Sequence, residues 1–252
     1  MKTILNLNKF YLNLNNLRKS LAVAFVGLGV FSTSYAATFD KEQKAQIENI
    51  IDDYVSNHPE VILRAMKKLE QDEKKNLEEN MLKIASKVRK SDSIPYLGKK
   101  NAKHYIIEFY DYNCGYCKVL EPMFERALKD YDVQIFFVNI PVIKENSKQL
   151  ALLGQAVFNL DKKKYFKLHE KFMTPGSINS DEQSIRKYLG EIGIDFENFK
   201  NELTSGRPQK QISSNIEDSI ELKIAGTPYL IIDGKEVRGA LTSYDALQEL
   251  LK

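Results

Sequence analysis

Two nearly continuous apolar stretches lie in the middle of the chain, and each predicts a short buried strand. Residues 106–110 form the first stretch, which contains one acid, and residues 133–140 form the second, which Pro141 ends. Between them, apolar side chains recur with helical spacing from Val119 to Leu128. A strand, a helix and a second strand in this order predict a β-α-β unit with parallel pairing.

The second half of the chain changes from strand to helix patterns and back. Residues 146–222 have helical periodicity throughout. Residues 229–233, an Asp-Gly turn and residues 235–238 then predict a β-hairpin, and a last helix follows it to Leu251. The sequence therefore predicts an α/β fold that contains a long helical insertion.

Residues 39–89 are rich in Lys, Glu and Asn with isolated aliphatic side chains, a pattern typical of amphipathic helices. Pro59 suits the first turn of a second helix. A thin apolar stripe runs along that helix with heptad-like steps and comprises Ile62, Met66, Leu69, Leu77, Met81, Ile84 and Val88. Because the stripe is too narrow to form a core within one chain, we expect it to join copies of the chain. A helix that lies on the main domain, or a solvated linker, is the alternative.

The first residues have the pattern of a secretory signal. Four basic residues and no acid come first, an apolar run covers residues 21–31, and small residues lead to Ala36. This order predicts a signal peptide over residues 1–36 that is cleaved after Ala36, and export from the cytoplasm. The apolar run is shorter than the roughly 20 residues of a membrane-spanning helix, and no cysteine near the cleavage site offers a lipid anchor, so we expect no membrane anchor.

Removal of the signal peptide changes the charge balance. The full chain has 37 Lys+Arg and 34 Asp+Glu, and loss of four basic residues leaves 33 against 34, a net charge of −1. Because the basic excess belongs to the signal, nothing favours nucleic acid as a partner. An exported chain of this length buries an adequate core without disulfide staples, so its two cysteines are available for chemistry.

Cys114 and Cys117 stand directly after the first predicted strand and at the start of the helix that follows it. A thiol at a helix N-terminus faces unpaired N–H groups and the positive end of the helix dipole, which lowers its pKa from about 8.5. We expect Cys114 to be the nucleophile of thiol-disulfide exchange and Cys117 to be the resolving thiol. Glu108, the acid on the first strand, is a candidate for taking and returning the proton of Cys117.

Other interpretations of these residues stay open. A structural disulfide between the two cysteines closes too small a loop to restrict the unfolded chain much. A zinc site needs four ligands and the chain has no second cysteine pair, so no metal and no cofactor is expected. The histidines, His58, His104 and His169, are scattered and are expected at surface or capping positions. Glu108 is alternatively a buried acid with satisfied hydrogen bonds and no part in catalysis.

The order of strand, C-x-x-C, helix, strand, and then a Thr227-Pro228 step before a hairpin and a last helix resembles the thioredoxin fold. In that fold the proline is cis and lies beside the cysteine pair. The long helical stretch between Cys117 and Pro228 resembles the inserted helical domain of the DsbA family of periplasmic thiol-disulfide oxidoreductases. Residues 98–118, with Glu108 six residues before the first cysteine, are very similar to the active-site segment of that family.

Residues 50–65 also resemble the N-terminal helices of the ScsC-like subgroup, where such helices precede the catalytic domain and can serve as an oligomerising stalk. The resemblance therefore implies a homo-oligomer. Thr227 before the proline is shared with isomerase-type members such as DsbC and DsbG. The dipeptide between the cysteines, Gly115 and Tyr116, tunes the potential in this family and departs from the Pro-His of the strong oxidases. These features imply isomerisation or reduction rather than pure oxidation.

We therefore expect a signal peptide over residues 1–36, a helical stalk over residues 37–91, and a thioredoxin-like catalytic domain over residues 92–252 with an insertion at about residues 142–222. The expected activity is thiol-disulfide exchange, as an isomerase or reductase, on client proteins with cysteines or disulfides, together with a membrane or periplasmic redox partner. A dithiol oxidase is the alternative within this class. A chaperone or a Cu(I) carrier that uses the two thiolates is the alternative outside it.

Overall fold

The computed structural model describes residues 39–252, and the expected signal peptide with its cleavage after Ala36 lies outside these residues. The chain divides by its contacts into two units, one that ends at Pro59 and one over Glu60–Lys252. The first unit contains α1 (Lys41–Asn57), which begins with a capping box between Asp40 and Gln43. None of the side chains of α1 is buried, so this amphipathic helix forms no core of its own.

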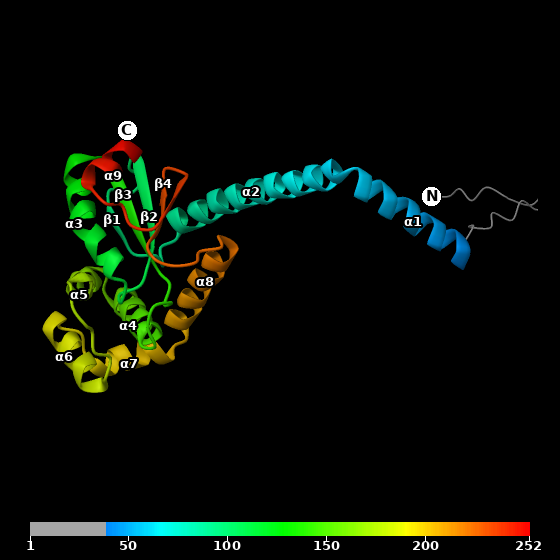
Figure 1. The fold of residues 1–252 in the computed structure, drawn as a ribbon. Helices are drawn as coiled ribbons and strands as arrows, with labels where there is room; N and C mark the ends of the chain where they lie inside the picture. Colours follow the sequence, from blue (N-terminus) through cyan, green and yellow to red (C-terminus); the bar gives the residue numbers. More distant parts are fainter. Residues whose placement is uncertain (1–38) are drawn as a thin grey trace, which may run out of the picture. The chain divides into compact units, whose positions relative to one another are not determined.

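The second unit is built on one mixed sheet (Figure 1). Its strands lie in the spatial order β1 (Tyr96–Gly98), β3 (Val133–Asn139), β2 (His104–Tyr110), β4 (Tyr229–Ile232) and β5 (Lys235–Arg238). Strands β2 and β3 are parallel, with His104 opposite Val133, and the other neighbours are antiparallel. The predicted β-α-β unit, with α3 (Gly115–Asp130) as its crossover, and the predicted hairpin are thereby confirmed.

Five helices separate β3 from β4 and form the predicted helical insertion. They are α4 (Ser147–Leu160), α5 (Lys162–Met173), α6 (Glu182–Ile192), α7 (Phe196–Thr204) and α8 (Arg207–Glu221). The last helix, α9 (Tyr244–Leu250), begins at Ser243, whose side chain accepts a hydrogen bond from the Ala246 N–H. The chain thus has the thioredoxin-type arrangement with a helical domain inserted before the final hairpin.

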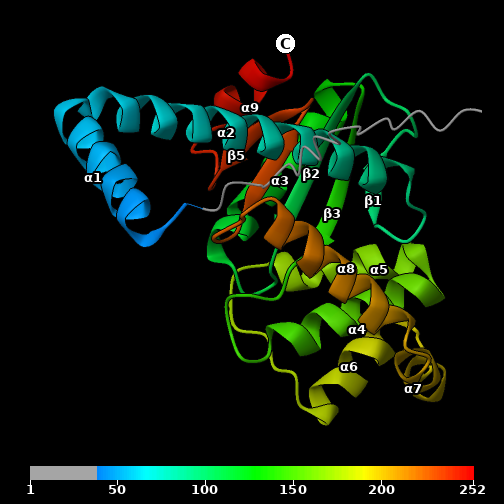
Figure 2. The ribbon, with the colours of Figure 1, turned by 90° about the vertical axis from the view of Figure 1, so that its right-hand side faces the viewer.

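Each face of the sheet packs against its own set of helices. On one face, Ile106 and Leu230 belong to a core that includes side chains of α3 and α9. On the other face, Ile107 and Ile231 pack with the C-terminal half of α2 (Pro59–Lys90) and with Leu222 at the end of α8. Figure 2 shows α2 crossing in front of the sheet and α3 behind it. The sheet is therefore a central layer between helices, as a mostly apolar β2 and β3 require.

The structure corrects half of the expected oligomerisation seam. Met81, Ile84 and Val88 are buried within the chain, between α2 and the sheet, so they are core residues and cannot join subunits. Leu77 is half-buried, and α2 continues as one helix from Pro59 to Lys90. The boundary expected near residue 91 is wrong for the same reason, because the catalytic domain includes the second half of α2.

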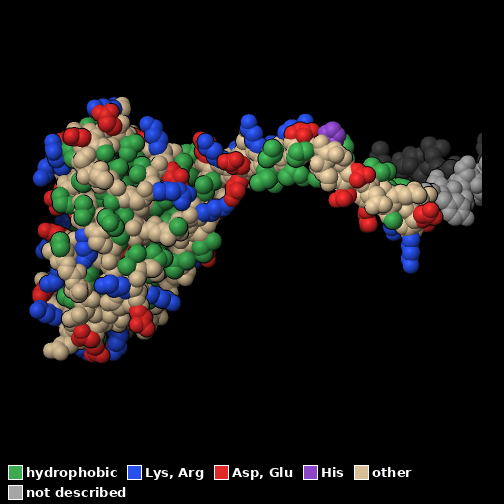
Figure 3. All heavy atoms as spheres, in the orientation of Figure 1, with side chains coloured by type: hydrophobic (Ala, Val, Ile, Leu, Met, Phe, Trp, Pro, Cys, Tyr) green, Lys and Arg blue, Asp and Glu red, His purple; other side chains and the backbone are tan. Residues whose placement is uncertain are grey.

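The other half of the seam has no such cover. Ile62, Met66 and Leu69 are exposed, and Leu63 beside them is 66% exposed. Figure 3 shows apolar side chains gathered along one side of the part of α2 that extends beyond the sheet. Large apolar side chains on one side of a helix that no other described element covers are a free apolar face.

The segment over residues 91–103, for which the sequence analysis predicts no element, contains the short edge strand β1. Tyr96 pairs with Phe136 and Gly98 with Gln134 in an antiparallel ladder. Gly98 has a φ of 89°, and a Cβ there would lie 2.1 Å from the carbonyl oxygen of Val133, so only glycine fits this approach. A strand of three residues is too short for its pattern to be read from sequence.

Candidate active site: a dithiol at the start of α3

Cys114 is the N-cap residue of α3 and follows the carboxyl end of β2 after three loop residues, 111–113. Its Sγ accepts a hydrogen bond from the Cys117 N–H at 3.4 Å and donates one to the carbonyl oxygen of Thr227 at 3.2 Å. Cys117 lies one turn into the helix and is completely buried. Both thiols are free, so the structure describes the dithiol form. The helix start thus holds the two sulfurs as the sequence predicts.

The pKa values of the two thiols are shifted in opposite directions. Hydrogen bonding from the Cys117 thiol and from the backbone N–H groups of Cys117 and Tyr116 lowers the pKa of Cys114 from 9.0 to about 6, although burial opposes this shift. Burial raises the pKa of Cys117 far above its usual range, and the neighbouring Cys114 and Glu108 raise it further. At neutral pH, therefore, the Cys114 thiol is largely ionised and no longer donates the hydrogen bond that its protonated form makes to the Thr227 carbonyl, whereas Cys117 holds its proton.

Glu108 lies on β2 with no solvent exposure, and neither carboxyl oxygen makes a hydrogen bond within residues 39–252. Burial raises the pKa of this carboxyl well above its usual value, and the charges of Glu121 and Cys114 act in the same direction. The Cys117 thiol is close enough to oppose that rise. Two buried oxygens without partners do not fit the alternative of an acid with satisfied hydrogen bonds, and the role of Glu108 in catalysis stays a prediction.

Thr227 and Pro228 bring the strand β4 to the cysteines. The peptide bond between them is cis, as the resemblance implies, and the Thr227 carbonyl is the group that contacts Cys114. The Thr227 hydroxyl is buried and bonds to no other group in the described part of the chain. Its donation toward the Cys114 sulfur is one of the contributions that lower the pKa of that thiol.

Thr227→Val tests whether this hydroxyl tunes the redox pair. We expect the substitution to raise the pKa of Cys114 and to shift the potential of the Cys114/Cys117 couple by tens of millivolts, where about 30 mV corresponds to 1.4 kcal/mol. Equilibration with a glutathione buffer measures the potential. Thr227→Ser keeps the hydroxyl and is the matched control. An unchanged potential and unchanged exchange rates in Thr227→Val would show that the hydroxyl has no such role.

Asp111, which the sequence analysis did not single out, organises the loops around the dithiol. Its carboxylate accepts hydrogen bonds from the backbone N–H groups of Asn113, Val142 and Ile143, at 2.8–2.9 Å, and from the Ser147 hydroxyl at 2.9 Å. These bonds tie the cysteine loop to the segment between β3 and α4. The only signal in the sequence was an acid directly after a predicted strand.

His169 overturns the expectation of a surface or capping position. It is buried on α5, with Nε2 3.1 Å from Glu121 and Nδ1 near the hydroxyls of Tyr112 and Tyr165. The carboxylate of Glu121 also raises the pKa of Glu108, so the contact with His169 holds in place a carboxylate that affects the redox site. His104 pairs with Asp233 at 2.7 Å at the start of β2.

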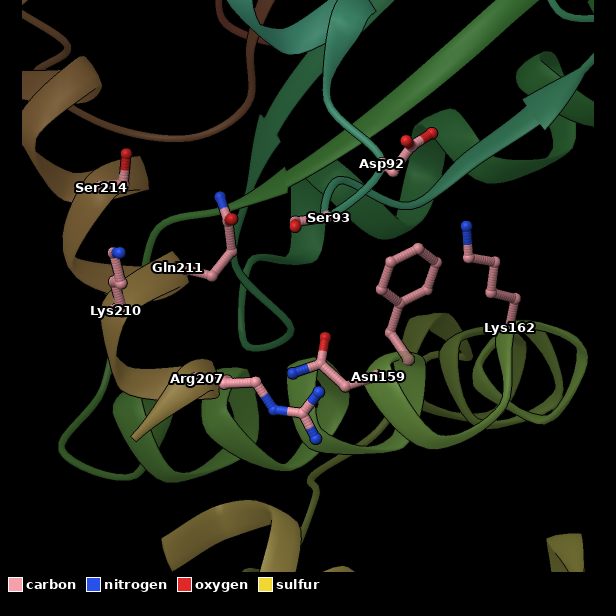
Figure 4. A pocket seen from close by; sticks show the side chains of 9 residues that line it. Asp92, Ser93, Asn159, Lys162, Arg207, Lys210, Gln211 and Ser214 are labelled. Atoms are coloured by element: carbon pink, nitrogen blue, oxygen red, sulfur yellow. The ribbon is translucent and has the colours of Figure 1, made fainter. Parts of the chain in front are cut away.

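A hollow of about 420 Å³ lies between α4, α8 and the segment after α2. Figure 4 shows Gln211 and Arg207 projecting from α8 toward Ser93 and Asn159. Arg207 and Asn159 both bind the buried carboxylate of Glu202. Neither cysteine nor Glu108 lines this hollow, so it is separate from the dithiol site.

A buried C-x-x-C dithiol at the N-terminus of the first crossover helix, beside a cis-proline on a thioredoxin-type sheet, defines the class of thiol-disulfide oxidoreductases. Comparison with known proteins supports this class and gives the family. The model of the DSBA-like thioredoxin domain matches residues 105–252, and the chain belongs to that family. Residues 43–75 match the N-terminal domain of the copper resistance protein ScsC.

Related proteins agree with this assignment. The disulfide bond formation protein D of Bacillus subtilis is 26% identical over 168 residues, which is 63% of this chain and 75% of the relative. The catalytic domain of Proteus mirabilis ScsC is 27% identical, with a TM-score of 0.61 over 69% of this chain and 96% of that chain. Proteus mirabilis ScsC in a transitional conformation is 25% identical, with a TM-score of 0.61 over 86% of this chain and 97% of that one. The protein is thus a thiol-disulfide oxidoreductase of the DsbA family.

Proposed function

We propose that this protein isomerises or reduces disulfides of client proteins outside the cytoplasm. In the first step the Cys114 thiolate attacks a client disulfide, forms a mixed disulfide and releases the other client sulfur as a thiolate. The Cys117 thiol then loses its proton and attacks Cys114, which forms the Cys114–Cys117 disulfide and releases the client thiolate. The client disulfide gains two electrons, and the dithiol loses them. In isomerisation the released client thiolate instead attacks a second disulfide of the client, and the thiolate freed there attacks the mixed disulfide, so the client sulfurs change partners and Cys114 returns to its thiolate form.

The opposite acidities of the two thiols carry this proposal. A nucleophile with a pKa of about 6 is largely ionised at neutral pH, whereas a buried partner that keeps its proton does not displace the client at once. The mixed disulfide therefore has time to rearrange. The exposed apolar face of α2 favours the isomerase, because several catalytic domains joined through it would hold a misfolded client while its bonds change.

Glu108 is the proposed acceptor of the Cys117 proton. Its carboxyl has no other partner among the described residues, and burial, which raises its pKa, makes its carboxylate a stronger base than an exposed one. We expect Glu108→Gln to slow the release of client from the mixed disulfide by about a hundredfold while the initial attack by Cys114 changes little, since general acid–base catalysis typically contributes 10²–10⁴-fold. Stopped-flow measurement of the two steps separates them. Equal slowing of both steps would show that Glu108 only supports the structure.

Two activity assays and the reduction potential of the Cys114/Cys117 couple test the function. We expect the reduced protein to restore activity to a test protein with scrambled disulfides faster than it oxidises the same protein from the fully reduced state. The potential of the couple sorts a reductant from an oxidant, since catalysts of this fold range from about −270 to −120 mV. Faster oxidation than rescue would identify a dithiol oxidase of the alternative kind.

A Cu(I) carrier is the second candidate, because residues 43–75 resemble a domain named for copper resistance and two thiolates suit this soft ion. In the part of the chain that the structure describes, no group of three or more His, Cys, Asp or Glu side chains is arranged to hold a metal. Disulfide turnover in the presence of a Cu(I) chelator distinguishes the two functions, because a carrier binds the ion without such turnover. A chaperone would protect clients even when both cysteines are replaced.

The proposed function also implies a location, a redox partner and self-association of the protein. We propose a periplasmic protein, exported through its signal peptide, that works with a membrane or periplasmic redox partner which keeps Cys114 and Cys117 reduced. Over residues 39–252 no helix has the length and apolar character to cross a membrane. Copies of the chain associate through Ile62, Met66 and Leu69, the exposed part of the apolar stripe.

A further inference from the structure

A hollow of about 730 Å³ opens beside Cys114, between the first turns of α3 and the end of α5 with its following loop. It reaches Asn113 and Gly115, the two residues that flank Cys114 in the chain. Apolar side chains and carboxylates alternate on its wall, which includes Val119, Pro122, Met173, Glu121, Glu125 and Glu170. A client segment that is covalently joined to Cys114 would extend over this wall.

The wall has a negative charge. Among the residues that line it, three carboxylates face one ammonium, that of Lys118, which gives a formal charge of −2. The Lys118 ammonium donates hydrogen bonds to the carbonyl oxygens of Thr174 and Gly176, both at 3.0 Å, so it is bound to the rim of the hollow.

The three carboxylates differ in their ion pairs and hydrogen bonds. Glu121 is bound to His169, whereas the exposed side chains of Glu125 and Glu170 form no ion pair or hydrogen bond within residues 39–252. Two free carboxylates next to an apolar surface complement a cation with an apolar stem, which is the chemistry of Lys and Arg side chains.

We infer that this wall selects client segments in which a Lys or Arg lies two to four residues from the attacked cysteine. The inference rests on the proposed function, since it describes how that site chooses its clients. An extended chain advances about 3.3 Å per residue, so such a side chain reaches the wall while the cysteine sulfur is bonded to Cys114. The basic side chain contacts Glu125 and Glu170, and its stem packs on Val119 and Pro122.

Peptides of equal length test this inference on the full, reduced protein. Each peptide contains one cysteine in a mixed disulfide with a small neutral thiol. The peptides differ from one another at a single position, three residues from that cysteine, which is Arg, Gln or Glu. In one series this position precedes the cysteine, and in the other it follows the cysteine. In at least one series we expect the second-order rate for Arg to exceed that for Gln by about fivefold in low salt, and Glu to be slower than Gln. The differences should fall below about twofold at 1 M salt, where the Debye length is about 3 Å.

A pair of double variants assigns the preference to the wall. In Glu125→Gln with Glu170→Gln, we expect the Arg-to-Gln rate ratio to fall to about one. Glu78→Gln with Glu217→Gln removes the same charge from exposed positions that do not line the hollow, and should leave the ratio unchanged. Equal rates for all peptides with the unmodified protein, or a ratio that persists in the first double variant, would overturn the inference and leave the oxidoreductase intact. Failure to react with any peptide would instead contradict the proposed function.

Discussion

We expect Cys114→Ser to abolish disulfide exchange, and Cys117→Ser to attack clients and then remain joined to them. These substitutions have the largest expected effect on activity. Cys114 is the N-cap residue of α3, where N–H groups and the Cys117 thiol stabilise its thiolate. A serine hydroxyl at position 114 is not ionised at neutral pH, so the exchange rate should fall to the uncatalysed rate. Without the Cys117 thiol, the mixed disulfide has no internal route to release. Non-reducing gels and intact-mass measurement of the adducts check both outcomes. Adducts on Cys114→Ser and none on Cys117→Ser would mean that the roles are reversed.

The pH dependence of alkylation gives an independent measure of the same nucleophile. Because the pKa of Cys114 is lowered to about 6, its thiolate forms as the pH rises through 6, and the rate of alkylation should reach its plateau above about pH 7. In Cys117→Ala the largest stabilising contribution, the hydrogen bond from the Cys117 thiol, is lost, so the midpoint should move to higher pH. An unchanged midpoint would show that the remaining donors, the backbone N–H groups and the Thr227 hydroxyl, set the acidity.

The parts of the fold that could be predicted from sequence are those with a local signature. The apolar runs around Ile107 and Phe136 indicate buried strands, since only a sheet covered on both faces accommodates them. Two cysteines at the start of a helix indicate thiol chemistry, because the helix N-terminus lowers the pKa of a thiol. The stripe on α2 is different. Its periodicity states that one side of the helix is apolar, but a sheet of the same chain and a helix of a second copy need the same pattern. Met81 and Ile84 therefore looked like Met66 and Leu69, although only the first two are core residues.

The contacts around the site could not be predicted, because they join residues that are distant in sequence. His169 meets Glu121 across 48 positions, and Asp111 meets Ser147 across 36. A lone histidine and a lone acid have no spacing rule that links them to a partner. Thr227 was found only because the resemblance placed it beside the cysteines, and the structure then identified its carbonyl as the contacting group.

Two truncations separate the associating part of the N-terminal helices from the part that belongs to the catalytic domain. Removal of residues 37–70 takes away the exposed apolar side chains and leaves the buried half of α2, together with the ion pair between Glu73 and Lys223. We expect a folded monomer that still reduces simple disulfides but loses most rescue of a scrambled protein, since the catalytic domains no longer face a common client. Removal of residues 37–90 should instead unfold the domain. It deletes Met81, Ile84 and Val88 from the core, and at about 1.5–3 kcal/mol for each buried side chain the loss of about 5–9 kcal/mol approaches the whole stability of a typical domain.

Light scattering gives the masses of the mature and truncated proteins, and chemical denaturation gives their stabilities. Met66→Lys with Leu69→Lys is the matched point variant, because both side chains are more than half exposed and their replacement leaves the core of the monomer intact. It should reproduce the monomeric mass and the lost rescue activity of the shorter truncation at unchanged stability. Ile84→Lys, which places a charge in the core, should lower the stability strongly. If the mature protein and the shorter truncation both had the mass of a monomer, the exposed face of α2 would not join subunits. The proposal of isomerisation by an assembly would then lose its structural basis, while the chemistry of Cys114 and Cys117 would stand, because that chemistry depends on contacts within a single chain.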